Sequence, residues 1–415
     1  MRLAIVGAGV SGLVAAHLLQ REHDVTVFEA NGYPGGHTNT IPVETDHASY
    51  AVDTGFIVFN DRNYPNFERL LGGLGVASQP STMSFGVSDG RGDFEYSSGS
   101  ANGLFANRRH LVDPTFRRMI SDLLRFNREA RDLLHTDGEG PSLGVWLERQ
   151  GFSQAFVERL IVPQASAVWS ADPRQLWSFP ARFLAEFFDN HGMLGFRGRP
   201  RWKTVRGGSA RYVDALIAPL GDRLRLRTPV SAITRAADHV GLTTPGGEPE
   251  TFDEVIVATH SDQALAMLTD PSDREHELLG AIPYQPNEAV LHTDRRLLPR
   301  RRAAWASWNY HLLDEPPERA TVTYHMNRLQ SITADQEFCV TLNRTETIDP
   351  DTIIRTISYA HPVYTAAGAA AQARHQEISG RNRTSYCGAY WGWGFHEDGV
   401  RSALRVCERF RARLP

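Results

Sequence analysis

Cysteine, lysine and long apolar runs are scarce in this 415-residue sequence, and each absence narrows what the protein can be. The three cysteines, Cys339, Cys387 and Cys407, cannot all pair and show no C-x-x-C spacing, which argues against a disulfide framework and a cysteine zinc site. The sequence has no run of about 18 apolar residues and no charged leader before the first apolar run. We therefore expect a cytoplasmic protein, and peripheral attachment to the inner face of the membrane stays open.

A surplus of basic charge is also lacking. The formal net charge is −4 and the sequence pI is about 6.5, which argues against nucleic acid as a partner, since such binders rely on neutralising phosphates. Lys203 is the single lysine among 44 basic residues, a bias typical of GC-rich coding. His17, His23 and His47 show no metal-ligand spacing, so no metal site is predicted.

The first thirty residues contain a complete dinucleotide-binding pattern. An apolar run at 3–6, a helical pattern at 13–19 and a second apolar run at 25–28 follow one another as strand, helix and strand. Three glycines at G-x-G-x-x-G spacing separate the first strand from the helix, and the second strand ends on an acid. This βαβ unit is far more specific than the glycine motif alone.

The chemistry of a bound dinucleotide explains these residues. Gly7 permits the tight turn, Gly9 lets a pyrophosphate approach the backbone, and Gly12 allows the helix to lie close to the sheet. The phosphates then meet the positive end of the helix dipole. Glu29 is placed to bind both ribose hydroxyls and would repel a 2′-phosphate, so FAD or NAD is favoured over NADP. The expected cofactor contacts here are Gly7, Gly9, Val10, Ser11, Gly12, Glu29 and Ala30.

A second glycine-rich loop, GYPGGHTNT at 32–40, makes the pattern resemble a particular family. A βαβ unit followed by such a loop resembles the FAD-binding amine-oxidase and phytoene-desaturase superfamily, in which the loop runs along the flavin and its phosphates. Many relatives carry arginines where this chain has Tyr33 and His37. The G-G-H form resembles a bacterial branch of predicted oxidoreductases associated with enzymes that methylate unsaturated fatty acyl chains. The resemblance adds as cofactor contacts Gly35, Gly36, His37 and Thr38.

Further FAD motifs lie in the middle and at the end of the chain. By resemblance, a strand at 50–60 continues the flavin-facing surface, a strand at 224–235 lies against the adenine, and a buried strand at 252–259 ends near the dinucleotide. These segments add as cofactor contacts Asp53, Gly55, Val230 and Ala258.

The C-terminal segment 386–414 resembles the last FAD motif of the superfamily. It has a short strand, an aromatic loop and a helix that we expect to begin near Gly399, with Asp398 as its N-cap. The dipole of this helix would stabilise an anionic reduced flavin. The expected cofactor contacts are Gly388, Asp398, Gly399 and Val400. The expected substrate contacts, as aromatic walls of a channel, are Tyr390, Trp391 and Trp393, with simple packing around a loop as the alternative.

Together the motifs predict an α/β fold. A discontinuous Rossmann-like FAD-binding domain of the GR2 or amine-oxidase type would carry a mixed α+β substrate domain. The predicted FAD-binding domain comprises residues 1–65, 200–262 and 375–415, and the predicted substrate or cap domain comprises residues 66–199 and 263–374. The helix at 66–74 is expected to leave the FAD-binding domain.

The predicted substrate domain is helical, aromatic and poor in cofactor signals. We expect helices at 114–134, 142–150 and 153–161, with Pro163 interrupting the last, and a short helical stretch at 350–358. The aromatic run at 177–188 and the basic run at 196–203 have two interpretations. They pack as core, or they form a hydrophobic tunnel entrance whose basic rim meets anionic lipid heads.

The flavin itself abstracts the hydride, so a nucleophilic triad is not expected. His396, His361 and Tyr364 are candidates to accept or relay a proton, although each has an ordinary structural alternative. Amine oxidases of this superfamily typically carry a lysine near flavin N5, and the corresponding strand at 288–294 has none. The first hypothesis is therefore an FAD-dependent desaturase or dehydrogenase acting on a methyl-branched or unsaturated fatty acyl chain. The alternatives are an oxidase of a small amine and a non-catalytic flavoprotein that presents lipid to a methyltransferase partner.

Overall fold

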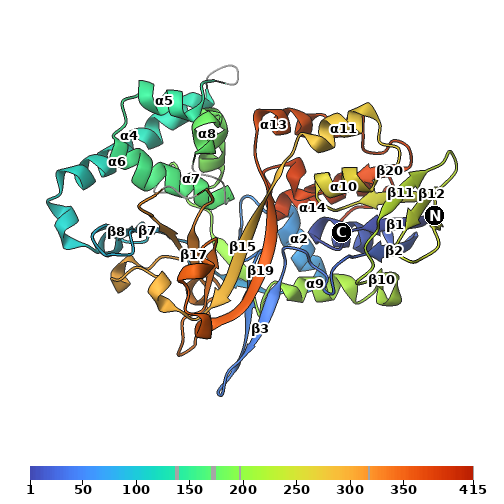
Figure 1. The fold of residues 1–415 in the computed structure, drawn as a ribbon, viewed down its shortest axis with the longest axis horizontal. Helices are drawn as coiled ribbons and strands as arrows, with labels where there is room; N and C mark the ends of the chain where they lie inside the picture. The colour runs from blue at the N-terminus through green and yellow to red at the C-terminus, as the bar shows by residue number, and fades with distance from the viewer. Residues whose placement is uncertain (136–139, 170–173, 196–197, 316–317, 415) are drawn as a thin grey trace.

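The computed structural model describes residues 1–135, 140–169, 174–195, 198–315 and 318–414. Figure 1 shows three regions: a parallel sheet with its helices at one end, the long strands β15 and β19 in the middle, and the helices α4 to α8 at the other end. Within the described ranges, no helix combines the length and the apolar character that a membrane crossing requires.

A five-stranded parallel sheet forms the first region, in the order β10-β2-β1-β14-β20. Its strands are β1 (Arg2–Val6), β2 (Asp24–Phe28), β10 (Leu224–Arg225), β14 (Glu254–Val257) and β20 (Thr384–Tyr386). They come from the beginning, the middle and the end of the chain, as predicted for a discontinuous Rossmann-like unit. The apolar runs of β1 and β14 are buried because helices or strands cover both faces of the sheet.

One face of the parallel sheet is covered by four helices that share a single apolar core with it. They are α1 (Val10–Leu19), α2 (Pro65–Leu74), α9 (Ala210–Ile217) and α14 (His396–Glu408). Helix α2 buries Phe67, Leu70 and Leu71 in this core. It therefore stays with the parallel sheet instead of leaving it at residue 66 as we expected.

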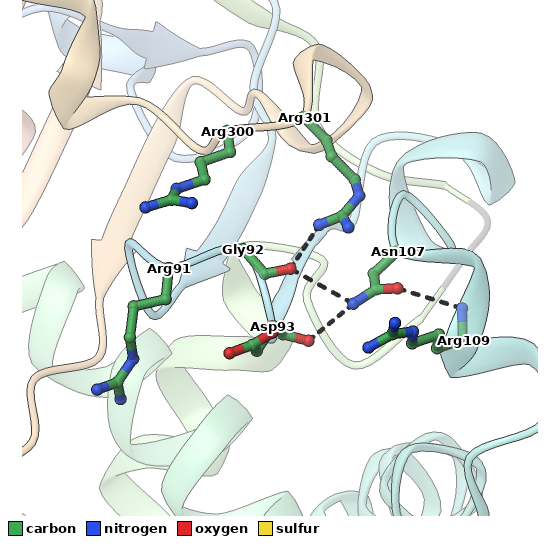
Figure 2. Close-up of a pocket in the computed structure, with 7 residues that line it drawn as sticks. All are labelled: Arg91, Gly92, Asp93, Asn107, Arg109, Arg300 and Arg301. Atoms are coloured by element: carbon green, nitrogen blue, oxygen red, sulfur yellow. Dashed lines mark hydrogen bonds between the residues drawn. The ribbon is translucent and has the colours of Figure 1, made fainter.

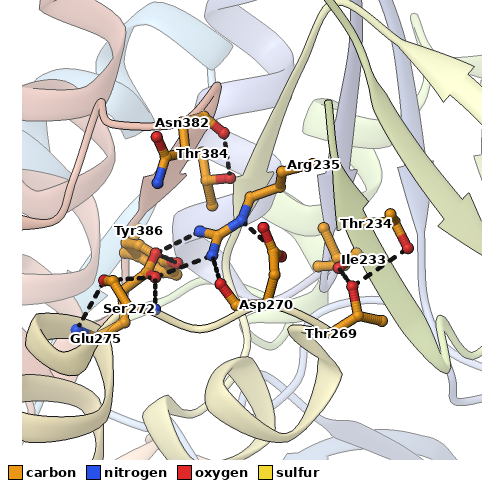
Figure 3. A network of polar contacts seen from close by, with 10 residues as sticks. All are labelled: Ile233, Thr234, Arg235, Thr269, Asp270, Ser272, Glu275, Asn382, Thr384 and Tyr386. Atoms are coloured by element: carbon orange, nitrogen blue, oxygen red, sulfur yellow. Dashed lines mark hydrogen bonds and ion pairs between the residues drawn. The ribbon is translucent and has the colours of Figure 1, made fainter. Parts of the chain in front are cut away.

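The other face is covered by a three-stranded antiparallel sheet and three helices. These elements are β11 (Ala232–Arg235), β12 (Val240–Thr243), β13 (Glu250–Phe252), α10 (Ser261–Met267), α11 (Asp273–Gly280) and α13 (Ala366–Ala373). The predicted single strand at 224–235 is therefore two strands in different sheets, with Val230 buried between them. A buried ion pair from Arg235 to Glu275, extended to the hydroxyl of Tyr386, ties this layer to β20 (Figure 3).

The middle of the molecule is a seven-stranded sheet in the order β19-β15-β18-β17-β16-β7-β8, antiparallel except between β16 and β7. Its strands are β7 (Phe85–Ser88), β8 (Glu95–Ser97), β15 (Tyr284–His292), β16 (Trp308–His311), β17 (Val322–His325), β18 (Cys339–Leu342) and β19 (Ile353–Pro362). The predicted helical stretch at 350–358 is wrong: after the short turn η8 (Pro350–Thr352) the chain is strand β19. Its isoleucines favour a strand, and β15 supplies the pairing.

Small sheets and a short helix flank this sheet. The strands are β3 (Thr40–Glu44) with β4 (Ser49–Asp53), and β5 (Phe59–Asn60) and β6 (Ser78–Pro80) on either side of β9 (Trp202–Val205), and the helix is α12 (Met326–Leu329). The segment 50–60 is thus two short strands in different sheets, because the chain turns at 54–58.

The helical region packs on the β7, β16 and β17 end of the seven-stranded sheet through its own core. Its helices are α3 (Ala101–Leu104), α4 (Pro114–Leu134), α5 (Leu143–Arg149), α6 (Gln154–Phe156), α7 (Val162–Trp169) and α8 (Ala181–Asn190). Contrary to the prediction, the helical segment continues through Pro163. A π-helical turn, η2 (Val157–Ile161), leads into α7, and the Arg159 carbonyl, four residues before the proline, accepts the Tyr96 hydroxyl at 2.9 Å. This hydrogen bond satisfies the Arg159 carbonyl, to which proline cannot donate because it has no N–H.

The remaining helical turns are short. They are η1 (Arg108–Leu111), η3 (Gln175–Ser178), η4 (Gly221–Arg223), η5 (Arg295–Leu297), η6 (Arg302–Ala304), η7 (Thr345–Thr347), η9 (His375–Glu377) and η10 (Ala389–Trp391).

Candidate active site

The first glycine turn has no room for side chains at two of its three glycines. Gly7 has φ +103°, and a Cβ on Gly12 would stand 1.9 Å from the Gly7 carbonyl oxygen. Gly9 differs, because a Cβ there would meet no atom within 4 Å. The space above Gly9 is therefore open, as a phosphate that approaches this backbone requires.

The N-terminal ends of α1 and α14 meet beside this turn. The Ser11 hydroxyl donates to the Gly399 carbonyl at 2.9 Å, and a Cβ on Gly399 would stand 2.7 Å from Val10 Cγ1. The first turn of α1 contains no acidic residue, and its N-cap, Gly9, has no side chain that could bond the free N–H groups. Those donors remain for an anionic ligand. The predicted contacts Val10, Ser11, Gly399 and Val400 are thus brought together.

Glu29 ends β2 as predicted, and its carboxylate is held by backbone groups. One oxygen accepts the Ala8 N–H at 2.8 Å, and the other accepts the backbone and side-chain N–H groups of Asn31 at 2.8 and 2.9 Å. The guanidinium of Arg227 lies over Gly32, whose added Cβ would stand 3.1 Å from its Nε. Arg227 is a cation beside the predicted adenosine site that sequence reasoning missed, because it arrives from 195 residues away. Ala30, also predicted here, is exposed.

The second glycine loop lies against the first. The Gly35 N–H donates to the Ala8 carbonyl at 2.8 Å, and Gly9 and Gly35 form an isolated parallel bridge. A Cβ on Gly36 would stand 3.3 Å from the Gly9 Cα, so the two loops are close packed. The structure therefore joins the two glycine motifs into one surface.

His37 follows this loop and joins a group of aromatic rings. Its ring stacks on Tyr359 at 4.9 Å and lies 5.3 Å from His361 and 5.9 Å from His260. Burial, and then the neighbouring His260, lowers the pKa of His37 to about 4. Burial, and then His37, lowers the pKa of His361 to about 3. At neutral pH these imidazoles are uncharged, so His37 does not replace the arginine charge that many relatives carry in this loop.

Asn287 determines which nitrogen of His361 carries the proton. The Asn287 side-chain oxygen accepts from Asn343 at 2.8 Å, which leaves its NH2 group to donate to His361 Nδ1 at 2.9 Å. His361 Nδ1 therefore accepts, and in the neutral ring Nε2 bears the hydrogen. This imidazole presents an N–H donor.

His396, the first residue of α14, lies in a separate network. Its Nε2 is 2.6 Å from the Tyr212 hydroxyl and 3.2 Å from the Thr38 hydroxyl, and its ring stacks on Phe56 at 3.6 Å. Burial, and then His37, lowers the pKa of His396 to about 3. Tyr212 and Phe56 were not predicted, because no local pattern connects them to the C-terminal motif.

Asp53 is fully buried and satisfied within the protein. Its carboxylate accepts from Thr40, from the N–H and hydroxyl of Ser209, and from Gln330. Burial raises the pKa of Asp53 to about 7. These bonds anchor the loop after β4, where a Cβ on Gly55 would stand 2.2 Å from the His37 carbonyl oxygen. A direct contact from Asp53 to the cofactor stays a prediction.

A group of aromatic side chains in mutual contact, here called the aromatic cluster, lies between the helical region and the start of α14. The ring centroids of Phe183 and Trp393 are 4.1 Å apart, those of Trp169 and Phe187 are 4.7 Å apart, and those of Phe183 and Tyr364 are 6.0 Å apart. Trp169 was not predicted, because the aromatic run begins eight residues after it. The cluster consists of Trp169, Phe179, Phe183, Phe187, Tyr364, Trp393 and Phe395.

The three predicted substrate contacts fall in two places. Trp393 belongs to the aromatic cluster, whereas Tyr390 and Trp391 are buried in the core beneath the parallel sheet. Gly388 follows β20 and lies beside them: its N–H donates to the Ser402 hydroxyl, and an added Cβ would stand 2.3 Å from the Tyr390 ring. For Tyr390 and Trp391 the placement favours the packing alternative.

The two acids at the start of α14 are already engaged. Asp398 is the third residue of the helix and not its N-cap: its carboxylate accepts the Phe395 N–H at 3.0 Å and pairs with Arg401. Burial raises the pKa of Asp398 to about 6. Glu397 accepts from both N–H groups of Asn66 and from the Phe67 N–H. The helix begins at His396, three residues earlier than expected, because Phe395 is the capping position.

A family model fits nearly the whole chain. Residues 10–410 match the flavin containing amine oxidoreductase family. The chain belongs to this family. The predicted family of flavin-containing oxidoreductases is therefore confirmed.

Relatives and solved structures agree with this assignment. Chloroplastic protoporphyrinogen oxidase of Oryza sativa subsp. japonica is 25% identical over 342 residues, which are 69% of this chain and 58% of that protein. A flavin-containing monooxygenase of Aspergillus flavus is 44% identical over 62 residues, 15% of this chain and 13% of that protein. The chain thus spans less than two thirds of the length of these curated relatives.

Two solved structures share the fold over the full chain. Cyclohexylamine oxidase from Brevibacterium oxydans superposes with a TM-score of 0.69 at 16% identity, covering 99% of both chains. A fatty acid isomerase from P. acnes superposes with a TM-score of 0.67 at 17% identity, covering 99% of this chain and 98% of that chain. These likenesses confirm the predicted α/β amine-oxidase fold.

The residues present fit the FAD of the flavin amine oxidoreductases. The open space over Gly9, the free N–H groups of α1 and the joined glycine loops suit a pyrophosphate, and Glu29 ends the strand where a ribose acid is expected. A metal is not indicated: no three His, Cys, Asp or Glu side chains among the described residues could hold one together.

Proposed function

We propose that this flavin amine oxidoreductase dehydrogenates or desaturates a hydrophobic substrate such as a methyl-branched or unsaturated fatty acyl chain. The observation that supports the proposal is the aromatic cluster, which ends at the N-terminus of α14. Bound FAD supplies the hydride acceptor in this family of reactions. The chain's own residues must then bind an apolar chain, orient it and exclude water.

The aromatic cluster suits an apolar substrate. Its neighbour His191 stacks on Phe187 at 4.0 Å, and burial lowers the pKa of His191 to about 4, so this ring is uncharged at neutral pH. The Tyr364 hydroxyl and the Trp169 indole N–H are buried and have no hydrogen-bond partner within the described residues. Flat aromatic walls with few polar groups bind hydrocarbon well and orient it through a small number of contacts.

The carboxylates that could bind a cationic amine near the aromatic cluster already have partners within the protein. Asp398 and Glu397 are held by the contacts given above. Lys203, the single lysine of the chain, pairs with Glu68 at 2.6 Å. The strand at 288–294, where the resemblance places the lysine of amine oxidases, has none, and the proposal favours acyl chains over amines.

The three residues predicted to accept or relay a proton take positioning roles in this proposal, and the proton that desaturation releases passes to water. Burial keeps the pKa of Tyr364 well above its usual value, so its hydroxyl stays protonated. His361 presents an Nε2–H donor, and His396 shares its Nε2 with Tyr212. In this proposal, Tyr364 and His361 position polar atoms of the substrate, and His396 holds the start of α14 in place.

The P. acnes protein with the same fold is a fatty acid isomerase, which supports the acyl proposal. The test is an anaerobic titration of the purified flavoprotein with phospholipids that bear unsaturated or methyl-branched chains, with cyclohexylamine and putrescine in parallel. Loss of the flavin absorbance with the lipid alone is expected. Loss with an amine alone would favour an amine oxidase, and no loss with either would favour a non-catalytic partner of a lipid methyltransferase.

A further inference from the structure

A pocket of about 400 Å³ lies far from the glycine loops, at the β7–β8 end of the seven-stranded sheet. Figure 2 shows that its walls come from three separate segments: the turn between β7 and β8, the turn η1, and the loop that precedes η6. The lining residues are Arg91, Gly92, Asp93, Asn107, Arg109, Arg300 and Arg301. Four guanidinium groups and one carboxylate therefore surround a single hollow.

Two of these arginines, Arg109 and Arg300, have no acidic partner among the residues that the structure describes. Arg301 pairs with the fully buried Glu95 at 2.7 Å, and Arg91 pairs with Asp314 at 2.7 Å. Arg300 donates only from Nε, to the Gly90 carbonyl at 3.0 Å, and no contact within the described residues engages the Arg109 guanidinium.

The scaffold of the pocket is rigid on the side that carries Arg109. The Asn107 side chain donates to the Asp93 carbonyl at 2.7 Å and accepts the Arg109 N–H at 3.2 Å (Figure 2). The guanidinium fork binds phosphate oxygens in a bidentate way. With Asp93 as the single lining carboxylate, Arg109 and Arg300 give the pocket a positive surplus suited to a phosphate group.

The same turn that supplies Arg109 also exposes a pair of aliphatic side chains. Leu111 ends η1 with 52% of its surface exposed, and the next residue, Val112, is 79% exposed. Helix α4 then begins, and its N-cap, Asp113, is occupied by the Thr115 N–H at 2.9 Å. Adjacent exposed aliphatic residues beside cations are the pattern of a protein that inserts into a lipid interface.

We infer that this pocket and the Leu111–Val112 pair dock the protein on a bilayer that contains anionic phospholipid, with a lipid phosphate held between Arg109 and Arg300. The charge of the pocket selects the phosphate, and the aliphatic pair selects a lipid surface over a free phosphate. This location differs from the runs at 177–188 and 196–203, for which core packing and a basic-rimmed tunnel entrance were the two interpretations. Phe196 and Arg197 of the latter run lie outside the described residues. The inference does not depend on the reaction proposed above.

The test is co-sedimentation of the flavin-loaded protein with vesicles of phosphatidylcholine, alone or mixed with phosphatidylglycerol. Binding to the mixed vesicles that weakens with salt is expected, because exposed charges are screened. An Arg109→Gln, Arg300→Gln double variant should bind at least about fivefold more weakly. A Leu111→Ser, Val112→Ser double variant should lose roughly tenfold. Val145→Ser and Arg149→Gln, two exposed positions on α5, are the matched controls and should bind as the unaltered protein does.

Flavin absorbance and melting temperature verify that each variant is folded, and changes in vesicle binding are read only against that control. The inference is overturned if the protein does not co-sediment with the mixed vesicles, or if both double variants bind them as well as the controls do. It is equally overturned if glycerol phosphate binds the pocket by calorimetry while the vesicles do not. These outcomes leave the flavin titration with acyl chains and amines unaffected, so the two proposals fail separately.

Discussion

Gly9 and Gly35 pair as an isolated bridge, which joins two glycine loops 26 residues apart, yet the space above Gly9 is open. A Gly9→Ala variant should therefore fold, because its φ of −74° suits alanine and the methyl group meets no atom. The methyl group would occupy the path of the FAD pyrophosphate. We expect the affinity for FAD to fall at least about tenfold, since overpacking costs about 1–3 kcal/mol. Flavin content and a fluorescence titration of the apoprotein measure the effect.

Gly72→Ala is the control for that variant, because an added Cβ there also meets no atom within 4 Å and the site is the outer part of α2. It should retain both fold and flavin. A Gly12→Ala variant should instead fail to fold, because its Cβ would collide with the Gly7 carbonyl. Full retention of FAD by Gly9→Ala would show that the phosphates lie elsewhere.

The buried ion pair between Arg235 and Glu275 makes a prediction about stability. The two side chains are 2% and 3% exposed, and Glu275 also accepts the Tyr386 hydroxyl (Figure 3). Glu275→Ala removes the buried partner and leaves Arg235 paired only with the half-exposed Asp270, which should cost about 3 kcal/mol of unfolding free energy. Thermal unfolding followed by flavin fluorescence measures the loss. Glu277→Ala, on the same helix but in solvent-exposed pairs, should lower the unfolding free energy far less.

His396 should make the protein less stable in acid. Its pKa is about 3 in the folded protein and about 6.5 in an unfolded chain, so between these values the unfolded state binds more protons. Stability should therefore fall as the pH drops below 6.5, by up to about 1.4 kcal/mol per pH unit from this residue. Melting temperatures of the His396→Gln variant between pH 7 and pH 4 should decline less steeply than those of the unaltered protein. An unchanged slope would contradict the burial of a neutral His396, and the exposed His47→Gln is the control for loss of an imidazole.

Trp393 and Trp391 should behave differently although they are two residues apart. Trp393→Leu removes a wall of the aromatic cluster and should slow reduction of the flavin by acyl substrate about tenfold, with the flavin still bound. Trp391→Leu opens a cavity in the core under the parallel sheet and should lower the melting temperature instead. Stopped-flow reduction and thermal unfolding of both variants separate these effects. If both variants slow flavin reduction equally, Trp391 contacts the substrate as first predicted.

Much of the cofactor region could be predicted because its signals are local. The predicted bounds of the βαβ unit at 3–28 and of helix α4 (Pro114–Leu134) agree closely with the structure. Each segment has its own hydrophobic period and its own residues that favour the start or end of an element. The pattern at 350–358 predicts a helical stretch, whereas residues 353–358 belong to β19. The partner strand β15 ends at His292, well before β19 begins, and the pattern of a single segment does not contain that pairing.

The surroundings of the predicted site were less accessible to sequence reasoning. Tyr212 and Phe56 reach His396 from other parts of the chain, and Trp169 joins Phe183 through helix packing. Such contacts depend on the tertiary arrangement, which no motif encodes. The roles of His361, Tyr364 and His396 stay predictions for the same reason, since their chemistry depends on what binds beside them.

The most direct test of the account is the anaerobic absorbance of the flavoprotein mixed with phospholipids that bear methyl-branched or unsaturated acyl chains. We expect the oxidised flavin band to disappear with these lipids and to persist with cyclohexylamine or putrescine. Reduction by the amines alone would contradict the substrate proposal. A purified protein that is colourless and binds no added FAD would contradict the cofactor site itself.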